Sequence, residues 1–285
     1  MANGYRKILV AYDGSKSARN ALVVASQLAK EAKSWIKVVA VVPTYVGDLE
    51  LIGVQNVKET IEGPGRKLLA EALKIADCQG VTILTNLEQG EPYDRIVHVA
   101  EDENCDLIVM GRRGLSHLER ELMGGVTARV IGHTPKDVLV VPETAKLAWN
   151  NIILATDGDP QSENPLLKAL QLANEHGSTL TAITAVYTND EIVALAHEMV
   201  AALVNNARDQ LEALAARAAE VGVTLQTVVK EGEPHQAITS LAIEKQASLI
   251  VMGTHGKKGL PRLLLMGSVT ERTIGYTECP VLIVH

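Results

Sequence analysis

The chain has 285 residues, of which 47% are hydrophobic and 21% are charged, and its formal net charge is −7. This composition is typical of a globular protein with room for two domains, and no run of about 18 apolar residues could span a membrane. The acidic balance argues against a large nucleic-acid-binding face, because affinity for a polyanion rests on clustered lysine and arginine side chains. The three cysteines lack metal-ligand spacing and the N-terminal residues lack a secretory signal pattern, so we expect reduced thiols and a cytoplasmic protein.

The first half of the chain alternates apolar runs of strand length with helical patterns. Strands are expected over residues 8–12, 37–42, 81–85, 106–110 and 137–142. Helices are expected over 18–33, from 66 to about 80, around 96–100 and around 127–131, whereas glycines and Pro64 predict a loop with a short helix over 44–64. This alternation implies a parallel sheet with right-handed crossovers and helices on both faces, which is a doubly wound, Rossmann-like α/β domain with strand order 3-2-1-4-5.

A glycine-rich turn follows the fourth predicted strand and leads into a helical pattern. Its residues are Gly111, Arg112, Arg113 and Gly114, and the helical pattern begins at Gly124, Gly125, Val126 and Thr127. Glycines let the backbone approach a phosphate closely, and the helix that follows directs free N–H groups and its positive dipole end at that phosphate. Ligands of doubly wound sheets lie beyond the carboxyl ends of the strands, where the winding reverses. Asp13, Val41 and Gly111, which follow or end three strands, are therefore expected to converge there.

The second half of the chain repeats the first. Asp157 matches Asp13 at an offset of 144 residues, Val186 matches Val41 at 145, and Gly253 matches Gly111 at 142. Such steady offsets indicate duplication of a whole domain, with domain 1 at residues 1–143, a linker at 144–150 and domain 2 at 151–285. In the second copy, the apolar pattern over 190–220 predicts one unbroken long helix.

With these residues in view, the chain resembles the universal stress protein family, specifically its tandem two-domain members, over essentially its full length. ATP-binding members of that family carry Gly-x-x-Gly, nine residues, and then Gly followed by Ser or Thr. The first copy keeps this spacing, with Gly125 in place of the hydroxyl residue. The second copy matches in residue type at Gly253, Gly256, Gly267 and Ser268, but ten residues intervene. The added residue must either bulge in the loop or rotate the start of the following helix by about 100°.

The resemblance implies a stress-response protein that binds ATP or another adenine nucleotide, alone or with Mg²⁺, and that acts in regulation or signalling. We do not expect an enzyme, beyond trace ATP hydrolysis, because the sequence lacks the catalytic groups described below. It places the aspartate after strand one and the valine at the end of strand two against the adenosine. The residues expected to bind nucleotide are Asp13, Val41, Gly111, Arg113, Gly114, Gly124, Gly125, Val126, Thr127, Asp157, Val186, Gly253, His255, Gly256, Gly267, Ser268 and Val269.

Duplicated domains tend to inherit the isologous interface that their ancestor made with itself, so we expect an internal pseudo-dimer seamed at residues 138–141 and 281–284. The resemblance implies the same seam. A further homodimer stays open, no nucleic-acid or membrane partner is expected, and the protein partner is not identified by the sequence.

Several residues have two interpretations on sequence alone. Asp13 and Asp157 fit turn residues as well as ligand contacts, and Arg112, Arg113 and His255 fit solvated side chains as well as phosphate donors. Thr127 and Thr270 could bond the backbone instead of phosphate. The sequence shows neither a nucleophile beside a base nor a Walker lysine followed by Ser or Thr. Two alternatives to a nucleotide-binding regulator remain, namely an interaction protein whose glycine turns only hold the sheet together and, less favoured, a slow ATPase.

Overall fold

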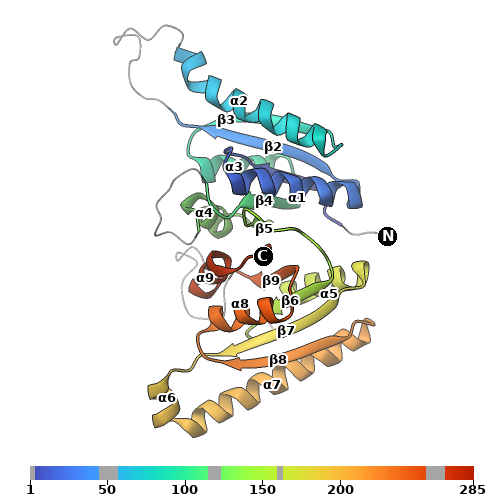
Figure 1. The fold of residues 1–285 in the computed structure, drawn as a ribbon, viewed down its shortest axis with the longest axis vertical. Coiled ribbons are helices and arrows are strands. Elements are labelled where there is room, and N and C mark those ends of the chain that lie inside the picture. The colour runs from blue at the N-terminus through green and yellow to red at the C-terminus, as the bar shows by residue number, and fades with distance from the viewer. Residues whose placement is uncertain (1–3, 45–56, 115–122, 159–162, 255–266) are drawn as a thin grey trace. The chain divides into compact units, whose positions relative to one another are not determined.

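The computed structural model describes residues 4–44, 57–114, 123–158, 163–254 and 267–285, and it divides into two compact units, Met1–Ala145 and Lys146–His285 (Figure 1). Within the first unit, parallel strands lie in the order β3-β2-β1-β4-β5. Within the second, the corresponding order is β8-β7-β6-β9-β10, again parallel. The doubly wound α/β fold with order 3-2-1-4-5 is therefore confirmed in both units.

The elements of the two units follow one another in the same sequence. The first unit contains β1 (Lys7–Ala11), α1 (Lys16–Ala32), β2 (Trp35–Val42), α2 (Val57–Cys78), β3 (Ile83–Gln89), α3 (Pro92–Asp102), β4 (Leu107–Gly111), α4 (Gly125–His133) and β5 (Asp137–Val141). The second contains β6 (Asn151–Ala155), α5 (Glu163–His176), β7 (Thr179–Val186), α6 (Asp190–Leu195), α7 (His197–Glu220), β8 (Leu225–Glu231), α8 (Pro234–Glu244), β9 (Leu249–Gly253), α9 (Ser268–Tyr276) and β10 (Val281–Val284).

The core of each unit lies along its central strands. Leu9, Val10 and Leu107 on β1 and β4 are completely buried, as are Leu154 and Val251 on β6 and β9. Strands that are apolar on both sides belong in a parallel sheet covered by helices on both faces. In the first unit α1 packs beside α2, and α3 packs beside α4. Among the described residues, none of the helices combines the length and apolar composition that a bilayer crossing requires.

Helix α2 begins at Val57, so the short helix expected within residues 44–64 and the helix expected from residue 66 form one continuous helix, and the predicted interruption between them is wrong. Pro64 lies inside the helix and is exposed. A Cβ at Gly65 would lie 2.4 Å from Leu87 Cδ1 and 2.7 Å from Val42 Cγ1, so this glycine lets the helix pack closely on β2 and β3. Close packing therefore explains a glycine that looks like a turn signal, and residues 45–56 lie outside the described part of the chain.

The unbroken helix predicted over residues 190–220 is also wrong. Ala196 adopts φ −140° and ψ 41°, which ends α6 and lets α7 start at His197. Asn189 caps α6, because its side chain accepts a hydrogen bond from the N–H of Ile192 at 2.8 Å. Neither glycine nor proline marks the break, so the local sequence carries no signal for it.

The segment between the units is anchored from both sides. The Asn20 side-chain amide on α1 donates to the carbonyls of Pro142 at 2.8 Å and Ala145 at 2.7 Å. Trp149 stacks on His176 of α5, with ring centroids 4.1 Å apart and planes 8° from parallel. Each unit thus holds its own end of the connection, while the assignment of residues 144–150 as a linker stays a prediction.

Candidate functional site

The carboxylate of Asp13 links the end of β1 to the glycine turn after β4. Its Oδ1 accepts a hydrogen bond from the N–H of Ser15 at 2.9 Å, which starts the turn into α1. Its Oδ2 lies against Gly114, where a Cβ would come within 2.5 Å of that oxygen. Oδ1 therefore stabilises the turn into α1, and Oδ2 lies beside the glycine turn. A role as a turn residue and a role as a ligand contact thus do not exclude each other.

The glycine turn is held against the first turn of α1. A Cβ at Gly111 would lie 2.5 Å from Ser17 Oγ and 2.7 Å from the amide nitrogen of Ala18, so only glycine fits there. The hydroxyls of Ser15 and Ser17 both donate to the carbonyl of Arg113, and the N–H of Arg113 donates back to Ser17 Oγ at 3.3 Å. Sequence analysis would treat these serines only as helix caps, and the Asp-Gly-Ser-x-Ser spacing is the signal that could have found them.

Helix α4 begins at the same place, and its N-cap residue has no side chain that could accept from the first N–H groups. Gly124 is the N-cap without a side-chain hydrogen bond, and its N–H donates to the carbonyl of Arg112 at 2.9 Å. The first N–H groups of a helix have no partner within it, so Gly125, Val126 and Thr127 supply donors for an anion. The Thr127 hydroxyl is buried and donates to the carbonyl of Gly111 at 3.1 Å, so this threonine bonds the backbone.

The backbone of Val41 lies at the same edge of the sheet. The carbonyl of Val39 accepts from the N–H of Tyr12, and the carbonyl of Val42 accepts from the N–H of Gly90. Because successive residues of a strand point their backbone groups to opposite sides, the N–H and C=O of Val41 face the β1 side. The last paired residues of the β1–β2 ladder are Ala11 and Val39, so the pairing ends before Val41. The backbone of Val41 therefore faces the space above the end of β1, beside Asp13.

The second unit repeats the framework around α9. The N–H of Gly267 donates to the carbonyl of Thr254 at 3.1 Å, and the Thr270 hydroxyl donates to the carbonyl of Gly253 at 3.2 Å. Gly267 has φ −65° and ψ 138°, against −66° and 138° for Gly124. The added residue therefore leaves the start of the helix unrotated, and the rotation alternative is wrong. His255 and Gly256 lie outside the described residues, as does the stretch 115–122 in the first unit.

The match between Val186 and Val41 is also wrong. In the second unit, Thr156 donates to the carbonyl of Ile183, and Gly232 donates to that of Val186. These bonds repeat those made by Tyr12 and Gly90 in the first unit. Val186 thus corresponds to Val42 at an offset of 144, and its backbone faces β8. The counterpart of Val41 is Ala185, an alanine in place of a valine. Matching by residue type chose the adjacent valine instead.

The two helix starts differ in charge and in hydroxyl content. Ser268 and Glu271 of α9 stand where α4 has Gly125 and Ala128, and both are exposed. The first turn of α4 has no acidic residue, whereas that of α9 contains Glu271. An added carboxylate near a helix N-terminus competes with an anionic ligand for the same donors, while the Ser268 hydroxyl adds a donor. Val269 follows Ser268 as Val126 follows Gly125.

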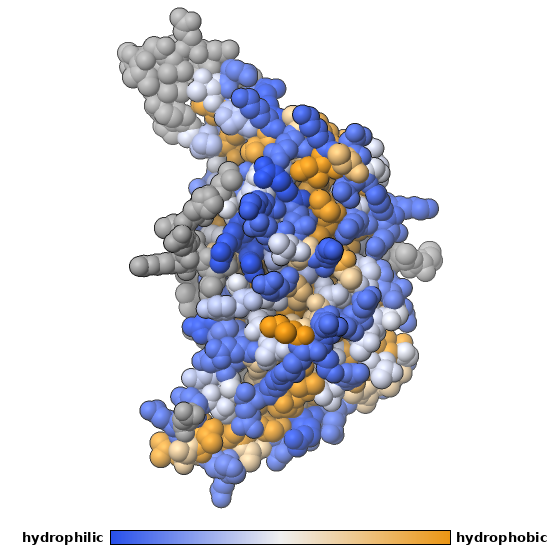
Figure 2. Space-filling model, viewed as in Figure 1, coloured by the Kyte–Doolittle hydropathy of each residue, from blue (hydrophilic) through white to orange (hydrophobic). Residues whose placement is uncertain are grey.

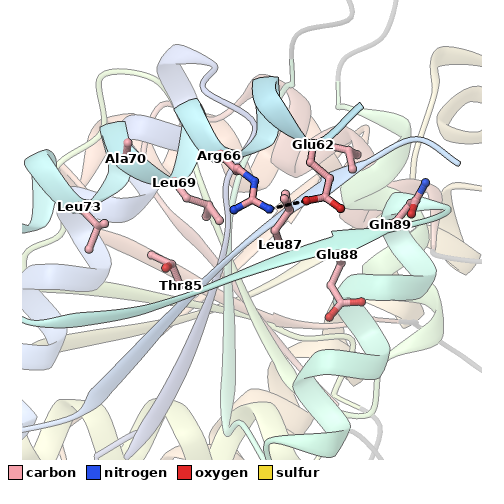
Figure 3. Close-up of a pocket in the computed structure, with 10 residues that line it drawn as sticks. Glu62, Arg66, Leu69, Ala70, Leu73, Thr85, Leu87, Glu88 and Gln89 are labelled. Atoms are coloured by element: carbon pink, nitrogen blue, oxygen red, sulfur yellow. Dashed lines mark hydrogen bonds and ion pairs between the residues drawn. The ribbon is translucent and has the colours of Figure 1, made fainter. Parts of the chain in front are cut away.

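A groove of about 480 Å³ lies elsewhere in the first unit, between α2 and β3 (Figure 3). Its apolar lining includes Leu69, Leu73 and Leu87, and Glu62 pairs with Arg66 at 2.6 Å on the helix side. None of the predicted nucleotide-binding residues lines it. Among the described residues, no group of three or more His, Cys, Asp or Glu side chains is placed to hold a metal ion.

Comparison with known proteins is consistent across both halves. A family model described as Universal stress protein family matches residues 4–142 and 148–285. A universal stress protein of Methanocaldococcus jannaschii is 36% identical over 146 residues, which cover 50% of this chain and 86% of that protein. One from Mycolicibacterium smegmatis is 27% identical over 244 residues, covering 81% of this chain and 80% of the relative. The solved structure of a universal stress protein from Archaeoglobus fulgidus has a TM-score of 0.71 at 21% identity, covering 99% of this chain and 96% of its own, a likeness of fold.

Proposed function

The chain belongs to the universal stress protein family, and from this premise we propose that it is a cytoplasmic stress-response protein that binds ATP or a related adenine nucleotide at its glycine turns. Its role in this proposal is regulation or signalling, with nucleotide occupancy as the regulated state. All three cysteines are free thiols, which fits a reducing compartment.

One observation carries the nucleotide proposal. In the first unit, the carboxylate of Asp13, the tightly packed Gly111–Gly114 turn and the N-terminus of α4 meet at one edge of the sheet. The N–H groups of Gly125, Val126 and Thr127 suit phosphate oxygens, and the exposed Arg113 adds a cation nearby. A carboxylate oxygen suits the hydroxyls of a ribose, which donate hydrogen bonds. The backbone of Val41 offers one donor and one acceptor to a base.

The same arrangement favours binding over turnover. The groups that it presents to a phosphate are backbone donors and an arginine, and the Thr127 hydroxyl is engaged with the carbonyl of Gly111. Hydrolysis requires a group that positions or deprotonates a water molecule. A Mg²⁺ ion in this proposal would be held chiefly by the nucleotide's phosphates. The pure interaction protein and the slow ATPase stay as the alternatives that the experiment separates.

The test combines identification of the ligand with a conservative substitution. Mass spectrometry of the small molecules released on denaturing freshly purified protein is expected to find an adenine nucleotide, and calorimetry to measure ATP binding. Asp13→Asn keeps the acceptor for Ser15 but removes the charge, so we expect ATP binding to the first unit to weaken about tenfold or more, given about 1.5–3 kcal/mol for a charged hydrogen bond.

Asp102→Asn is the matched control, because it removes an exposed carboxylate from the end of α3. We expect it to leave ATP binding unchanged, and both variants to melt like the wild type. Absence of binding in the wild type would leave the interaction protein as the better account. A turnover near about 1 per second would instead identify an enzyme.

A further inference from the structure

An exposed apolar surface lies over α6 and the first turns of α7 in the second unit. It consists of Tyr187, Val193, Leu195, Met199 and Leu203, with Leu195 88% and Met199 51% exposed. Figure 2 shows apolar residues gathered where Figure 1 places α6 and the start of α7. The neighbouring Ala194, Ala201 and Ala202 are exposed as well, so small apolar residues continue the surface. We call these five large residues the α6–α7 surface.

Within the described residues of its unit, α7 packs on the sheet through residues other than those of this surface. The helix contacts β8 and β7, and its buried residues are Val200, Ala207, Leu211 and Ala218. Met199 and Leu203 are four residues apart and therefore share a face of the helix, and this face stays exposed. A helix that is apolar on more than its core-facing side is typical of a segment covered by another element. The break at Ala196 places α6 in contact with α7, which brings Leu195 to the same region.

The charged residues of α6 and of the first turns of α7 have one sign. No lysine or arginine occurs in the sequence between Lys168 and Arg208, whereas Asp190, Glu191 and Glu198 do. Glu191 and Glu198 are exposed. Lys230, near the end of β8, is paired with Glu244 at 2.6 Å. A ligand that covers this surface therefore meets the carboxylates of Glu191 and Glu198, and neither helix contributes a lysine or arginine before Arg208.

We propose that the α6–α7 surface binds a basic amphipathic helix of a partner protein. The apolar face of that helix would cover Leu195, Met199 and Leu203, and its lysine or arginine side chains would pair with Glu191 and Glu198. An amphipathic helix laid on an exposed apolar face is a recurring mode of peptide recognition, and methionine adapts to varied partners. A second copy of this chain is the poorer occupant, because an isologous contact would oppose the same carboxylates. An anionic membrane is disfavoured by the same charge.

The test uses a labelled peptide of about 18 residues, five helical turns, with leucine on one face and lysine on the other. Its fluorescence anisotropy is measured with the full chain at low salt, beside a peptide with glutamate in place of every lysine. We expect the lysine peptide to bind and the glutamate peptide not to bind. The double variant Leu195→Gln/Met199→Gln should weaken binding about tenfold or more, as expected for apolar anchors. Glu191→Gln/Glu198→Gln should weaken it and flatten its salt dependence.

Ile243→Gln is the matched control, because Ile243 is 76% exposed on α8, outside the α6–α7 surface. We expect it to bind the peptide like the wild type, and circular dichroism should show all variants folded. Equal binding of the two peptides, or no loss in Leu195→Gln/Met199→Gln, would overturn the proposal. The proposal would also be overturned if sedimentation showed a dimer of the chain that dissociates in this double variant. Stronger binding to anionic vesicles than to the peptide would overturn it as well.

Discussion

The glycines of the first glycine turn are present for different physical reasons. Gly111 and Gly114 stand where a Cβ would collide with α1 or with Asp13, so they are required by packing around the turn. Among the described residues, no atom lies within 4 Å of the position that a Cβ of Gly125 would occupy, and Gly125 is exposed. A side chain at Gly125 is therefore compatible with the fold.

We predict that Gly125→Ser tightens ATP binding to the first unit about fivefold. The serine hydroxyl adds one donor at the start of α4, and such a hydrogen bond contributes on the order of 1 kcal/mol. Calorimetry measures the change, and Gly125→Ala is the matched control because it adds the Cβ without the hydroxyl. Equal affinities of the serine and alanine variants would contradict this role for the hydroxyl.

In each unit, the helix before the last-but-one strand and the helix after the glycine turn share an aromatic contact, and its two members are exchanged between the units. Tyr93 on α3 meets His133 on α4 at 5.0 Å between ring centroids, and His235 on α8 meets Tyr276 on α9 at 5.4 Å. An ion pair accompanies each contact, Glu91–Arg129 at 2.8 Å in the first unit and Glu233–Arg272 at 3.7 Å in the second. The two copies therefore keep the contact between the helices and not the residue at each position.

For these helices we predict that Tyr93→His/His133→Tyr costs less stability than Tyr93→Ala. The exchange keeps an aromatic pair, whose contribution beyond area burial is about 0.5–1.5 kcal/mol, whereas alanine removes the pair and the Arg129 guanidinium over the Tyr93 ring. We expect the free energy of unfolding of the exchanged protein, measured in urea, to lie within about 1 kcal/mol of the wild-type value. A loss as large as that of Tyr93→Ala would show that the positions are not interchangeable.

Over the whole molecule, the two glycine turns are expected to differ in nucleotide affinity. The added residue of the second copy predicted weaker binding there through a rotated helix start, but the start of α9 is unrotated and only a charge difference remains. Glu271 adds a carboxylate to the first turn of α9, where α4 has Ala128, and Thr254 stands in the place of Arg112. The Ser268 hydroxyl acts in the opposite direction because it adds one hydrogen-bond donor. The two substitutions outweigh it, since one adds a negative charge and the other removes a positive charge. We therefore predict tighter binding in the first unit.

Nucleotide stoichiometry in Asp13→Ala and Asp157→Ala measures this ranking, once circular dichroism has shown both proteins folded. We expect Asp13→Ala to lose most binding at low ATP and Asp157→Ala to keep it. Glu271→Ala should raise the affinity of the second unit, because it removes the competing carboxylate. Loss of most binding in Asp157→Ala alone would reverse the ranking. The packing of the two units as an internal pseudo-dimer stays a prediction.

The sequence by itself determined the fold class, the strand order, the duplication and the approximate place of the candidate site. Apolar runs, an Asp-Gly turn and a glycine-rich turn are local signals, and their recurrence in a second copy supported the prediction of a duplicated domain. Only the tertiary structure decided that Ala185, not Val186, corresponds to Val41, and that the added residue leaves α9 unrotated. It also decided that Gly65 serves close packing within a helix. Each of these depends on hydrogen bonds or contacts between segments distant in the chain, and local sequence patterns do not encode which distant atoms will meet.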